Sequence, residues 1–137
     1  GENARLARRL RIRYAASALP VRVLEFVETM PELMAASDLL VTKAGGLTVM
    51  EALAMGVPMV LCGVIPGQER FNAEYVVRHG AAILTSGVEA AVASTLRLVA
   101  QPQALEAMRA RAIALAKPRA AEDIVSRLVS PAGHGTT

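Results

Sequence analysis

Aromatic residues, cysteine and histidine are all scarce in this sequence, and each shortage excludes a class of site. Aromatic side chains make up 3% of the 137 residues, which leaves few platforms for stacking bases, so we expect no nucleic-acid partner. The single cysteine, Cys62, excludes an internal disulfide and suits a cytoplasmic protein. The two histidines, His79 and His134, are far apart in the sequence and make no metal-ligand pattern with one cysteine.

Long hydrophobic runs are absent as well. No stretch reaches the roughly 18 apolar residues that span a bilayer, and no signal peptide is recognised. We therefore expect a cytoplasmic protein that meets a membrane only peripherally, at its inner face. The net charge is only +3, but arginines gather near the start, at Arg5, Arg8, Arg9, Arg11 and Arg13. A solvated helix face explains this cluster most simply, and contact with anionic lipid is the alternative.

Hydrophobic residues make up 53% of the sequence, enough for a substantial core in one domain. Short apolar runs alternate with segments of helical periodicity, which predicts an α/β fold. Strands are predicted at residues 21–27, 38–42, 59–61 and 81–85. Helices are predicted at residues 4–14, 31–37, 48–55, 68–79, 88–100, 103–116 and 120–129. We assign the domain to residues 1–129 and expect residues 130–137 to be a flexible tail.

The domain is organised around the stretch 38–62. It is typical of a strand, a glycine turn at Gly45 and Gly46, a helix that closes on Gly56, and a second strand. The first backbone N–H groups of a helix lack internal acceptors and lie at the positive end of its dipole. The turn therefore suits an anion such as phosphate, and the plainer interpretation is that both glycines only make the turn.

Two side chains of the following helix favour a binding site. Thr48 offers a hydroxyl to a bound phosphate, or a cap to the helix. Glu51 places a carboxylate on an otherwise apolar helix, where burial is costly unless donors such as sugar hydroxyls meet it. Because ligands bind at the carboxyl ends of parallel strands, the glycine turn and the loops at residues 28–30 and 63–68 are expected on one rim.

Several motifs together resemble a known family. They are Phe26-Val27-Glu28-Thr29-Met30-Pro31-Glu32-Leu33-Met34, Thr42-Lys43-Ala44-Gly45-Gly46-Leu47-Thr48 with Glu51-Ala52, Gly56-Val57-Pro58, Pro66-Gly67-Gln68-Glu69 and Asn72. Over residues 1–82 the sequence resembles the carboxyl-terminal half of monogalactosyldiacylglycerol synthases and bacterial diacylglycerol glucosyltransferases, and more distantly the lipid II pathway N-acetylglucosaminyltransferase. The most specific part is the pairing of Thr-Lys-x-Gly-Gly with Pro-Gly-Gln-Glu about twenty residues later.

The resemblance implies the carboxyl-terminal domain of a GT-B glycosyltransferase, a Rossmann-like parallel sheet with helices on both faces that binds a UDP-sugar. Such enzymes transfer a hexose to a lipid acceptor such as diacylglycerol, and the amino-terminal domain holds the acceptor and the general base. Because backbone amides and the helix dipole stabilise the departing diphosphate, no bound metal or other cofactor is expected.

The resemblance also assigns roles to individual residues. The pyrophosphate meets the glycine turn and helix start, and the ribose, the uracil and the sugar are held by other loops. The pyrophosphate residues are Gly45, Gly46, Leu47 and Thr48, with Lys43 beside them, and the ribose residue is Glu51. The uracil residues are Phe26, Val27 and Met30. The sugar residues are Gln68 and Glu69, with Asn72 in the same site. Plainer interpretations remain open for three positions: Phe26 as core, Gln68-Glu69 as a helix start, and Asn72 as a bridge between loops.

The sequence departs from the family in what is missing. The amino-terminal domain is not present, nor is the first strand of this domain, which is expected just before Gly1. In the strand order 3-2-1-4-5, that absence leaves a gap between residues 21–27 and residues 59–61. We expect the isolated chain to close the gap by pairing these strands, or to self-associate through the open edges, and to be inactive alone.

Two other functions remain open. One is a UDP-binding subunit of a split glycosyltransferase that needs a separate partner chain, which predicts an exposed apolar face near the glycine turn. The other is a UDP-sugar epimerase of the same architecture, against which the Pro-Gly-Gln-Glu loop counts. A Rossmann dehydrogenase is disfavoured because no G-x-G-x-x-G follows a first strand.

Overall fold

The structure is a computed structural model that describes residues 2–65 and 67–129. These residues form two compact units, of which the first ends at Leu33 and the second begins at Met34. A short helix, α2 (Met30–Ala35), crosses the boundary between them. The predicted tail, residues 130–137, lies outside the described residues, and the assignment of residues 1–129 to one domain stays a prediction.

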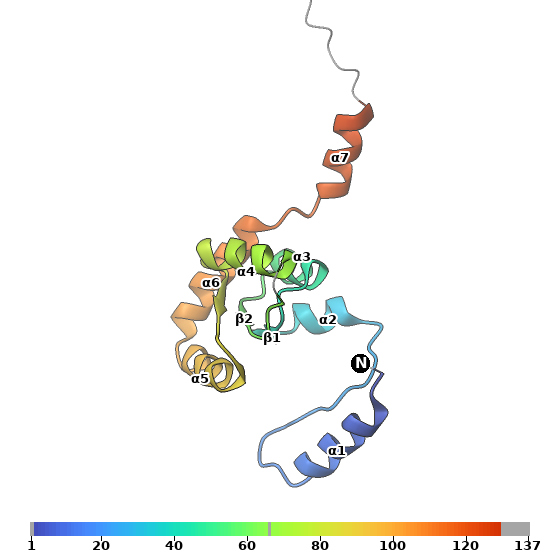
Figure 1. Cartoon of the computed structure of the whole chain (residues 1–137), viewed down its shortest axis with the longest axis vertical. Coiled ribbons are helices and arrows are strands. Elements are labelled where there is room, and N and C mark those ends of the chain that lie inside the picture. The colour runs from blue at the N-terminus through green and yellow to red at the C-terminus, as the bar shows by residue number, and fades with distance from the viewer. Residues whose placement is uncertain (1, 66, 130–137) are drawn as a thin grey trace, which may run out of the picture. The chain divides into compact units, whose positions relative to one another are not determined.

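The first unit consists of helix α1 (Ala4–Tyr14) and an irregular segment that follows it (Figure 1). The predicted cap is confirmed, because the Asn3 side chain accepts a hydrogen bond of 2.9 Å from the N–H of Leu6. Near the end of the helix, Arg11 donates to the Glu25 carboxylate at 2.8 Å and to the Val23 carbonyl at 3.3 Å. One arginine therefore ties the irregular segment to the helix.

The strand predicted at residues 21–27 is wrong, because this segment is neither strand nor helix. Its apolar alternation is present, yet Leu24 is 52% exposed and Phe26 is 67% exposed. A strand is stable only when a neighbour pairs with its backbone groups. Within the described chain no strand pairs with this segment, so the alternation has no sheet face to bury.

The second unit contains a parallel sheet of β1 (Leu40–Thr42), β2 (Met59–Leu61) and β3 (Ala82–Leu84). The order is β1-β2-β3, with Leu40 opposite Met59 and Met59 opposite Ala82. The predicted gap beside residues 59–61 is therefore wrong, as is its closure by residues 21–27, because β1 pairs with β2 directly. The predicted strand order 3-2-1-4-5 does not describe this sheet. Strand order depends on contacts between distant segments, which local sequence patterns do not report.

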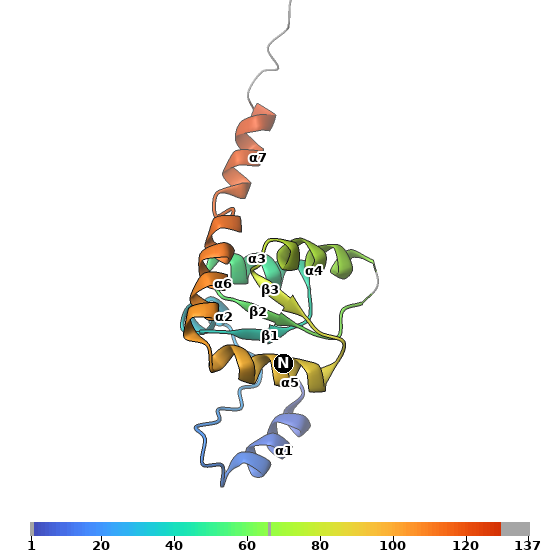
Figure 2. The same ribbon diagram turned by 90° about the vertical axis from the view of Figure 1, so that its left-hand side faces the viewer.

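Helices cover both faces of the sheet, as predicted (Figure 2). On one face lie α3 (Gly46–Ala54) and α4 (Gln68–Arg78), and on the other lies α5 (Val88–Val99). The central strand shows why both faces need covering: Met59 and Leu61 pack in the core beneath α3 and α4, and Val60 packs against residues of α5. All three are fully buried, which is typical of a parallel strand.

Two glycines end the helices that precede β2 and β3. Gly56 has φ 66° and Gly80 has φ 76°, the left-handed conformation that glycine adopts without steric cost. After α3, the N–H of Gly56 donates to Leu53 and the N–H of Val57 donates to Ala52, at 3.0 and 2.8 Å. This pair of bonds is a Schellman motif, so the predicted helix end at Gly56 is confirmed.

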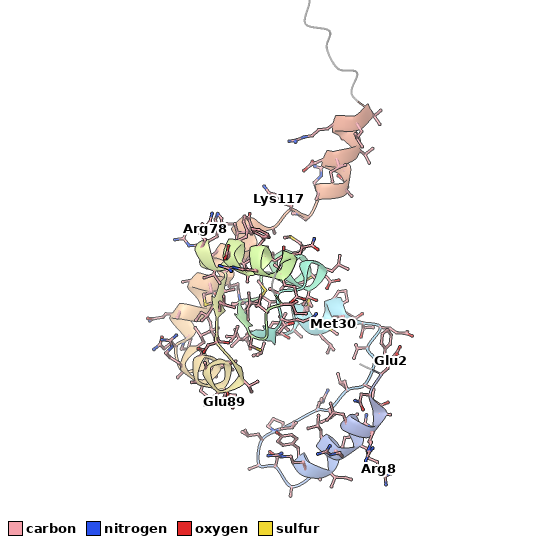
Figure 3. The ribbon with its side chains drawn as sticks, viewed as in Figure 1. Glu2, Arg8, Met30, Arg78, Glu89 and Lys117 are labelled. Atoms are coloured by element: carbon pink, nitrogen blue, oxygen red, sulfur yellow. The ribbon has the colours of Figure 1, made fainter. Side chains whose placement is uncertain are left out.

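The remaining helices are α6 (Pro102–Leu115) and α7 (Ala120–Val129). The first packs closely on α3, since a Cβ added at Gly56 would lie 2.8 Å from Cγ1 of Ile113. Charges also suit the helix ends in this unit: Glu89 lies in the first turn of α5 and Arg78 in the last turn of α4 (Figure 3). In the described part of the chain, no helix has the length and apolarity needed to cross a membrane.

Neither outer edge of the sheet, at β1 or at β3, has a strand partner among the described residues, and the β1 edge carries an apolar side chain beside a groove. Leu40 donates its N–H to Pro58, and Thr42 accepts from the N–H of Cys62, so both face β2. In a parallel strand alternate residues point their backbone groups to opposite sides, which leaves the N–H and C=O of Val41 on the free edge. The side chain of Val41 is 47% exposed and lines an apolar groove of about 240 Å³ against α5.

Candidate nucleotide-sugar site

The site begins where β1 ends and α3 begins. Gly45 is the N-cap residue of α3, with φ −63° and ψ 134°, and no side chain caps the helix. The predicted alternative in which Thr48 caps the helix is therefore wrong. The first helical bond runs from the N–H of Val49 to the carbonyl of Gly45. Among the described residues, no acceptor meets the N–H groups of Gly46, Leu47 and Thr48, so they remain available to an anion.

Glycine keeps the space beside these N–H groups open. A Cβ at Gly46 would lie 3.5 Å from the amide nitrogen of Asn72, on the side that faces α4. A Cβ at Gly45 would lie 4.0 Å from the Thr48 hydroxyl. Neither glycine has the positive φ that only glycine adopts readily, so the backbone alone does not require them. What their small size provides is access to the start of α3.

A pocket of about 480 Å³ lies between the start of α3 and the start of α4. Residues from both helix ends line it, and most of them were predicted site residues. The lining consists of Gly45, Gly46, Leu47, Met50, Gln68, Glu69 and Asn72. The structure therefore brings the glycine turn and the Gln-Glu motif together at one rim, although their nearest members, Leu47 and Gln68, are 21 positions apart in the sequence.

Lys43 joins this pocket through Glu69. Its ammonium donates to the Glu69 carboxylate over 2.8 Å, and the second carboxylate oxygen accepts from the N–H of Ile65 at 3.1 Å. The hydrogen bond from Lys43, and after it the one from Ile65, hold the pKa of Glu69 below its usual value. Two predicted site residues thus form an ion pair, of which Glu69 is the member that lines the pocket.

Asn72 bridges two elements, as the plainer interpretation proposed. Its side-chain amide donates to the carbonyl of Ala44 at 3.1 Å, which links α4 to the glycine turn. The helix-start interpretation of Gln68 and Glu69 is also confirmed, since α4 begins at Gln68 and Glu69 lies in its first turn. Both findings are compatible with ligand contact, because all three side chains also line the pocket.

Two predicted residues of α3 lie outside the pocket lining. Thr48 is half-buried and Glu51 is exposed. The expected burial of Glu51 is therefore wrong: the buried face of α3 carries Val49, Ala52 and Leu53, and Glu51 lies off that face. An exposed carboxylate has no desolvation cost, so sugar hydroxyls are not needed to explain its position. Its contact with the ribose stays a prediction.

Sequence reasoning missed one lining residue, Met50, which is 49% exposed. Met50 follows Leu47 by three residues, which places the two side chains on one face of the helix, and this spacing could have identified it. The three predicted uracil residues, Phe26, Val27 and Met30, belong to the first unit. Phe26 is exposed, Val27 is half-buried and Met30 is the first residue of α2, so the core interpretation of Phe26 is wrong.

Comparisons with known proteins point to one family. The model of the Glycosyltransferase family 28 C-terminal domain matches residues 2–128. A processive diacylglycerol beta-glucosyltransferase of Bacillus subtilis (strain 168) is 37% identical over 109 residues, which are 80% of this chain and 28% of that protein. Monogalactosyldiacylglycerol synthase 3, chloroplastic, of Arabidopsis thaliana is 38% identical over 112 residues, which are 78% of this chain and 23% of that protein.

A third relative acts on a different acceptor. The UDP-N-acetylglucosamine--N-acetylmuramyl-(pentapeptide) pyrophosphoryl-undecaprenol N-acetylglucosamine transferase of Pseudomonas fluorescens is 36% identical over 130 residues, 90% of this chain and 36% of that protein. The crystal structure of MurG from Acinetobacter baumannii superposes with a TM-score of 0.78 at 24% identity, over 90% of this chain and 38% of that one. The chain thus spans between 23% and 36% of the length of these curated relatives. It belongs to the Glycosyltransferase family 28 C-terminal domain family, and its fold is the carboxyl-terminal half of a GT-B fold.

Proposed function

We propose that this domain binds a UDP-hexose and serves an enzyme that transfers the hexose to a lipid acceptor such as diacylglycerol. The observation that carries the proposal is the pocket in which the open start of α3 faces polar side chains from the start of α4. Two relatives with names that include diacylglycerol support the acceptor class. The relative named after UDP-N-acetylglucosamine supports a uridine diphosphate donor.

The diphosphate of the donor is assigned to the glycine turn. The N–H groups of Gly46, Leu47 and Thr48 donate to its oxygens at the positive end of the α3 dipole, and Lys43 adds a positive charge nearby. The same groups stabilise the negative charge that develops on the departing diphosphate, which is how backbone donors accelerate group transfer. The hexose then lies toward Gln68, Glu69 and Asn72, which offer donors and acceptors to its hydroxyls.

In this proposal the uridine lies beyond the start of α3. Glu51 is exposed, so its carboxylate is accessible to both ribose hydroxyls. Phe26, Val27 and Met30 receive the uracil. Substitutions at these three residues would test the uracil assignment separately from the pocket, because the residues belong to the other compact unit of the chain.

The acceptor and the general base are assigned to a second domain that faces this rim. Leu47 and Met50, which line the pocket, are 83% and 49% exposed, and Ile65, whose N–H bonds Glu69, is 56% exposed, so apolar side chains are exposed at this site. A facing domain would cover it, whether it lies in the same protein or in a separate partner chain as in split glycosyltransferases. The isolated domain is therefore expected to bind the donor and to turn nothing over.

Peripheral contact with the inner face of a membrane is part of the proposal, and α1 is the element that supports it. Of its five arginines, only Arg11 has a carboxylate partner within the described residues. Arg8 projects from the helix in Figure 3 and is exposed. Basic helices are attracted to anionic lipid. Replacing Arg8 and Arg9 by glutamate should weaken sedimentation of the chain with anionic vesicles, and unchanged sedimentation would contradict this role.

The experiment that tests the binding function is calorimetry with UDP, UDP-glucose and ADP. We expect UDP and UDP-glucose to bind and ADP to bind more weakly; ADP binding as tight as UDP binding would overturn the uridine assignment. Gly45→Leu should lower UDP affinity at least tenfold by filling the start of α3. Gly87→Leu is the matched control, since Gly87 is the N-cap glycine of α5 and does not line the pocket.

A second measurement tests the assignment of the diphosphate to protein groups alone. If backbone N–H groups and Lys43 suffice, UDP affinity should be the same in excess EDTA and in millimolar Mg²⁺. A large loss of affinity in EDTA would mean that a metal ion bridges the diphosphate and the protein. The titration uses the same chain and ligand, so no variant is needed.

A further inference from the structure

Glu69 differs from the other polar residues of the pocket because contacts hold both of its carboxylate oxygens. One oxygen accepts from the Lys43 ammonium at 2.8 Å and the other from the N–H of Ile65 at 3.1 Å. The Glu69 side chain is 16% exposed, whereas that of Lys43 is 60% exposed. Glu69 is therefore the fixed member of the pair, and Lys43 is the member that it restrains.

These contacts join three segments of the second unit. Lys43 follows β1, Ile65 lies in the loop after β2, and Glu69 lies in the first turn of α4. One turn later on the same helix face, Asn72 holds the carbonyl of Ala44, the residue between Lys43 and the glycine turn. Two side chains of α4 thus fix the loops that leave two neighbouring strands.

Restraint matters most for Lys43. A lysine side chain loses much rotamer freedom when it is fixed, so an unrestrained lysine gives up entropy each time it meets an anion. With Glu69 in place, part of that loss has already occurred before a ligand arrives. The cation then stands beside the glycine turn, two residues before Gly45 in the sequence.

We propose that Glu69 is a positioning residue for the diphosphate, because it holds Lys43 and the loop at residues 63–65 beside the start of α3. This role differs from a direct contact with the sugar, and it rests on the proposed binding of a UDP-sugar. It predicts that Glu69 affects UDP, a ligand with no sugar at all. It also predicts that the effect passes through Lys43.

The sign of the effect makes the proposal testable. Coulomb interaction alone predicts that removing a carboxylate near an anion site tightens anion binding, since a repulsion is lost. If Glu69 acts by positioning Lys43, its removal weakens binding instead. Glu69→Ala removes both contacts, and Glu69→Gln removes the charge but keeps an oxygen that can accept from Ile65.

The experiment measures UDP and UDP-glucose affinity in a double-mutant cycle of Glu69→Ala and Lys43→Met. We expect Glu69→Ala to weaken UDP at least fivefold in the wild-type background and less than twofold in the Lys43→Met background. UDP-glucose should lose affinity by at least the same factor as UDP, and any loss beyond that factor measures a contact between Glu69 and the sugar. Glu74→Ala is the matched control: Glu74 pairs with Arg70 on the same helix, lies outside the pocket lining, and should leave both affinities unchanged.

Three results would overturn the proposal. A loss confined to UDP-glucose would make Glu69 a sugar contact only, and tighter UDP binding would make it a competitor of the phosphates for Lys43. Equal losses in both backgrounds would remove Lys43 from the effect. If Glu69→Ala unfolds, Glu69→Gln takes its place in the cycle with the same criteria. Absence of UDP binding by the wild-type chain would instead overturn the proposed function, and this inference with it.

Discussion

Residues 40–61 and residues 21–27 both contain apolar runs suited to strands, but only the first region forms them. In the first region β1 and β2 pair in register, and the middle strand is buried on both faces. In the second region Leu24 and Phe26 are more than half exposed, and Arg11 of α1 donates hydrogen bonds to Val23 and Glu25. The difference teaches that backbone partners and burial decide whether such a run becomes a strand, whereas local propensity only permits it.

The largest expected effect is a loss of stability when a core residue of the packed region is truncated, compared with the same truncation in the unpaired region. Leu53 of α3 is 1% exposed and lies in the core with Met59 and Leu61 of β2, whereas Leu24 is 52% exposed. Leu53→Ala should lower the free energy of unfolding by about 2–5 kcal/mol, because it leaves a cavity in the core. Leu24→Ala, the same chemical change, should cost less than about 0.5 kcal/mol. Urea unfolding of both variants measures the contrast, and equal losses would mean that residues 21–27 are packed in solution.

The next effect concerns UDP binding by Glu51, which is exposed and lies off the buried face of α3. Glu51→Gln should leave the fold intact and lower UDP affinity by about 1.5–3 kcal/mol, the range for hydrogen bonds to a charged group. If the carboxylate accepts from the ribose, deoxyuridine diphosphate should show a smaller penalty in the variant than in the wild type. Calorimetry measures all four combinations. Equal penalties in both proteins would mean that Glu51 does not touch the ribose.

A third effect concerns the free edge of β1, which resembles the unpaired region because no described strand pairs with it. An edge with an unpaired N–H and C=O and an apolar side chain favours pairing with another chain, and a lysine on the edge opposes it. We expect the isolated chain to self-associate, and Val41→Lys to weaken association about tenfold. Sedimentation velocity at several concentrations measures this, with Leu24→Lys, at an exposed apolar residue outside the sheet, as control. A wild-type chain that stays monomeric would contradict the prediction.

The smallest expected effect comes from the Lys43–Glu69 pair, which is partly solvent-exposed. Its contacts lower the pKa of Glu69, so the stability they add is complete above the ordinary pKa of 4.5 and is lost as the pH falls below it. Lys43→Met should therefore be slightly less stable than the wild type at pH 7. The difference between the two urea midpoints should shrink as the pH falls from 7 to 3. A difference that stays constant over this range would need another cause than this pair.

Helix ends were predictable from the sequence because their rules are local. Asn3 caps α1, Gly56 ends α3, and α7 has the predicted bounds, since each feature depends on a few neighbouring residues. The glycine turn and the α4 start were also found, as parts of one motif pair. Strand order was not, because it depends on pairing between residues about twenty positions apart, which no local pattern reports.

The candidate site shows the same difference between features that follow local rules and features that depend on distant residues. The strand-turn-helix pattern predicted the turn at Gly45 and Gly46, and both glycines line the pocket at the start of α3. The ion pair of Lys43 and Glu69 spans 26 residues and could not be read from spacing. The burial of Glu51 was expected because the helix is otherwise apolar, whereas the buried face of α3 carries only Val49, Ala52 and Leu53.

Gly56 limits which sequences this fold can accept over evolution. A replacement there meets two separate obstacles: its φ of 66° strains any residue with a Cβ, and that Cβ would lie 2.8 Å from Ile113. Shrinking residue 113 would relieve the contact and leave the backbone strain. Among homologues, position 56 should therefore vary only toward asparagine, the residue that best tolerates this conformation, and then together with a smaller residue at position 113.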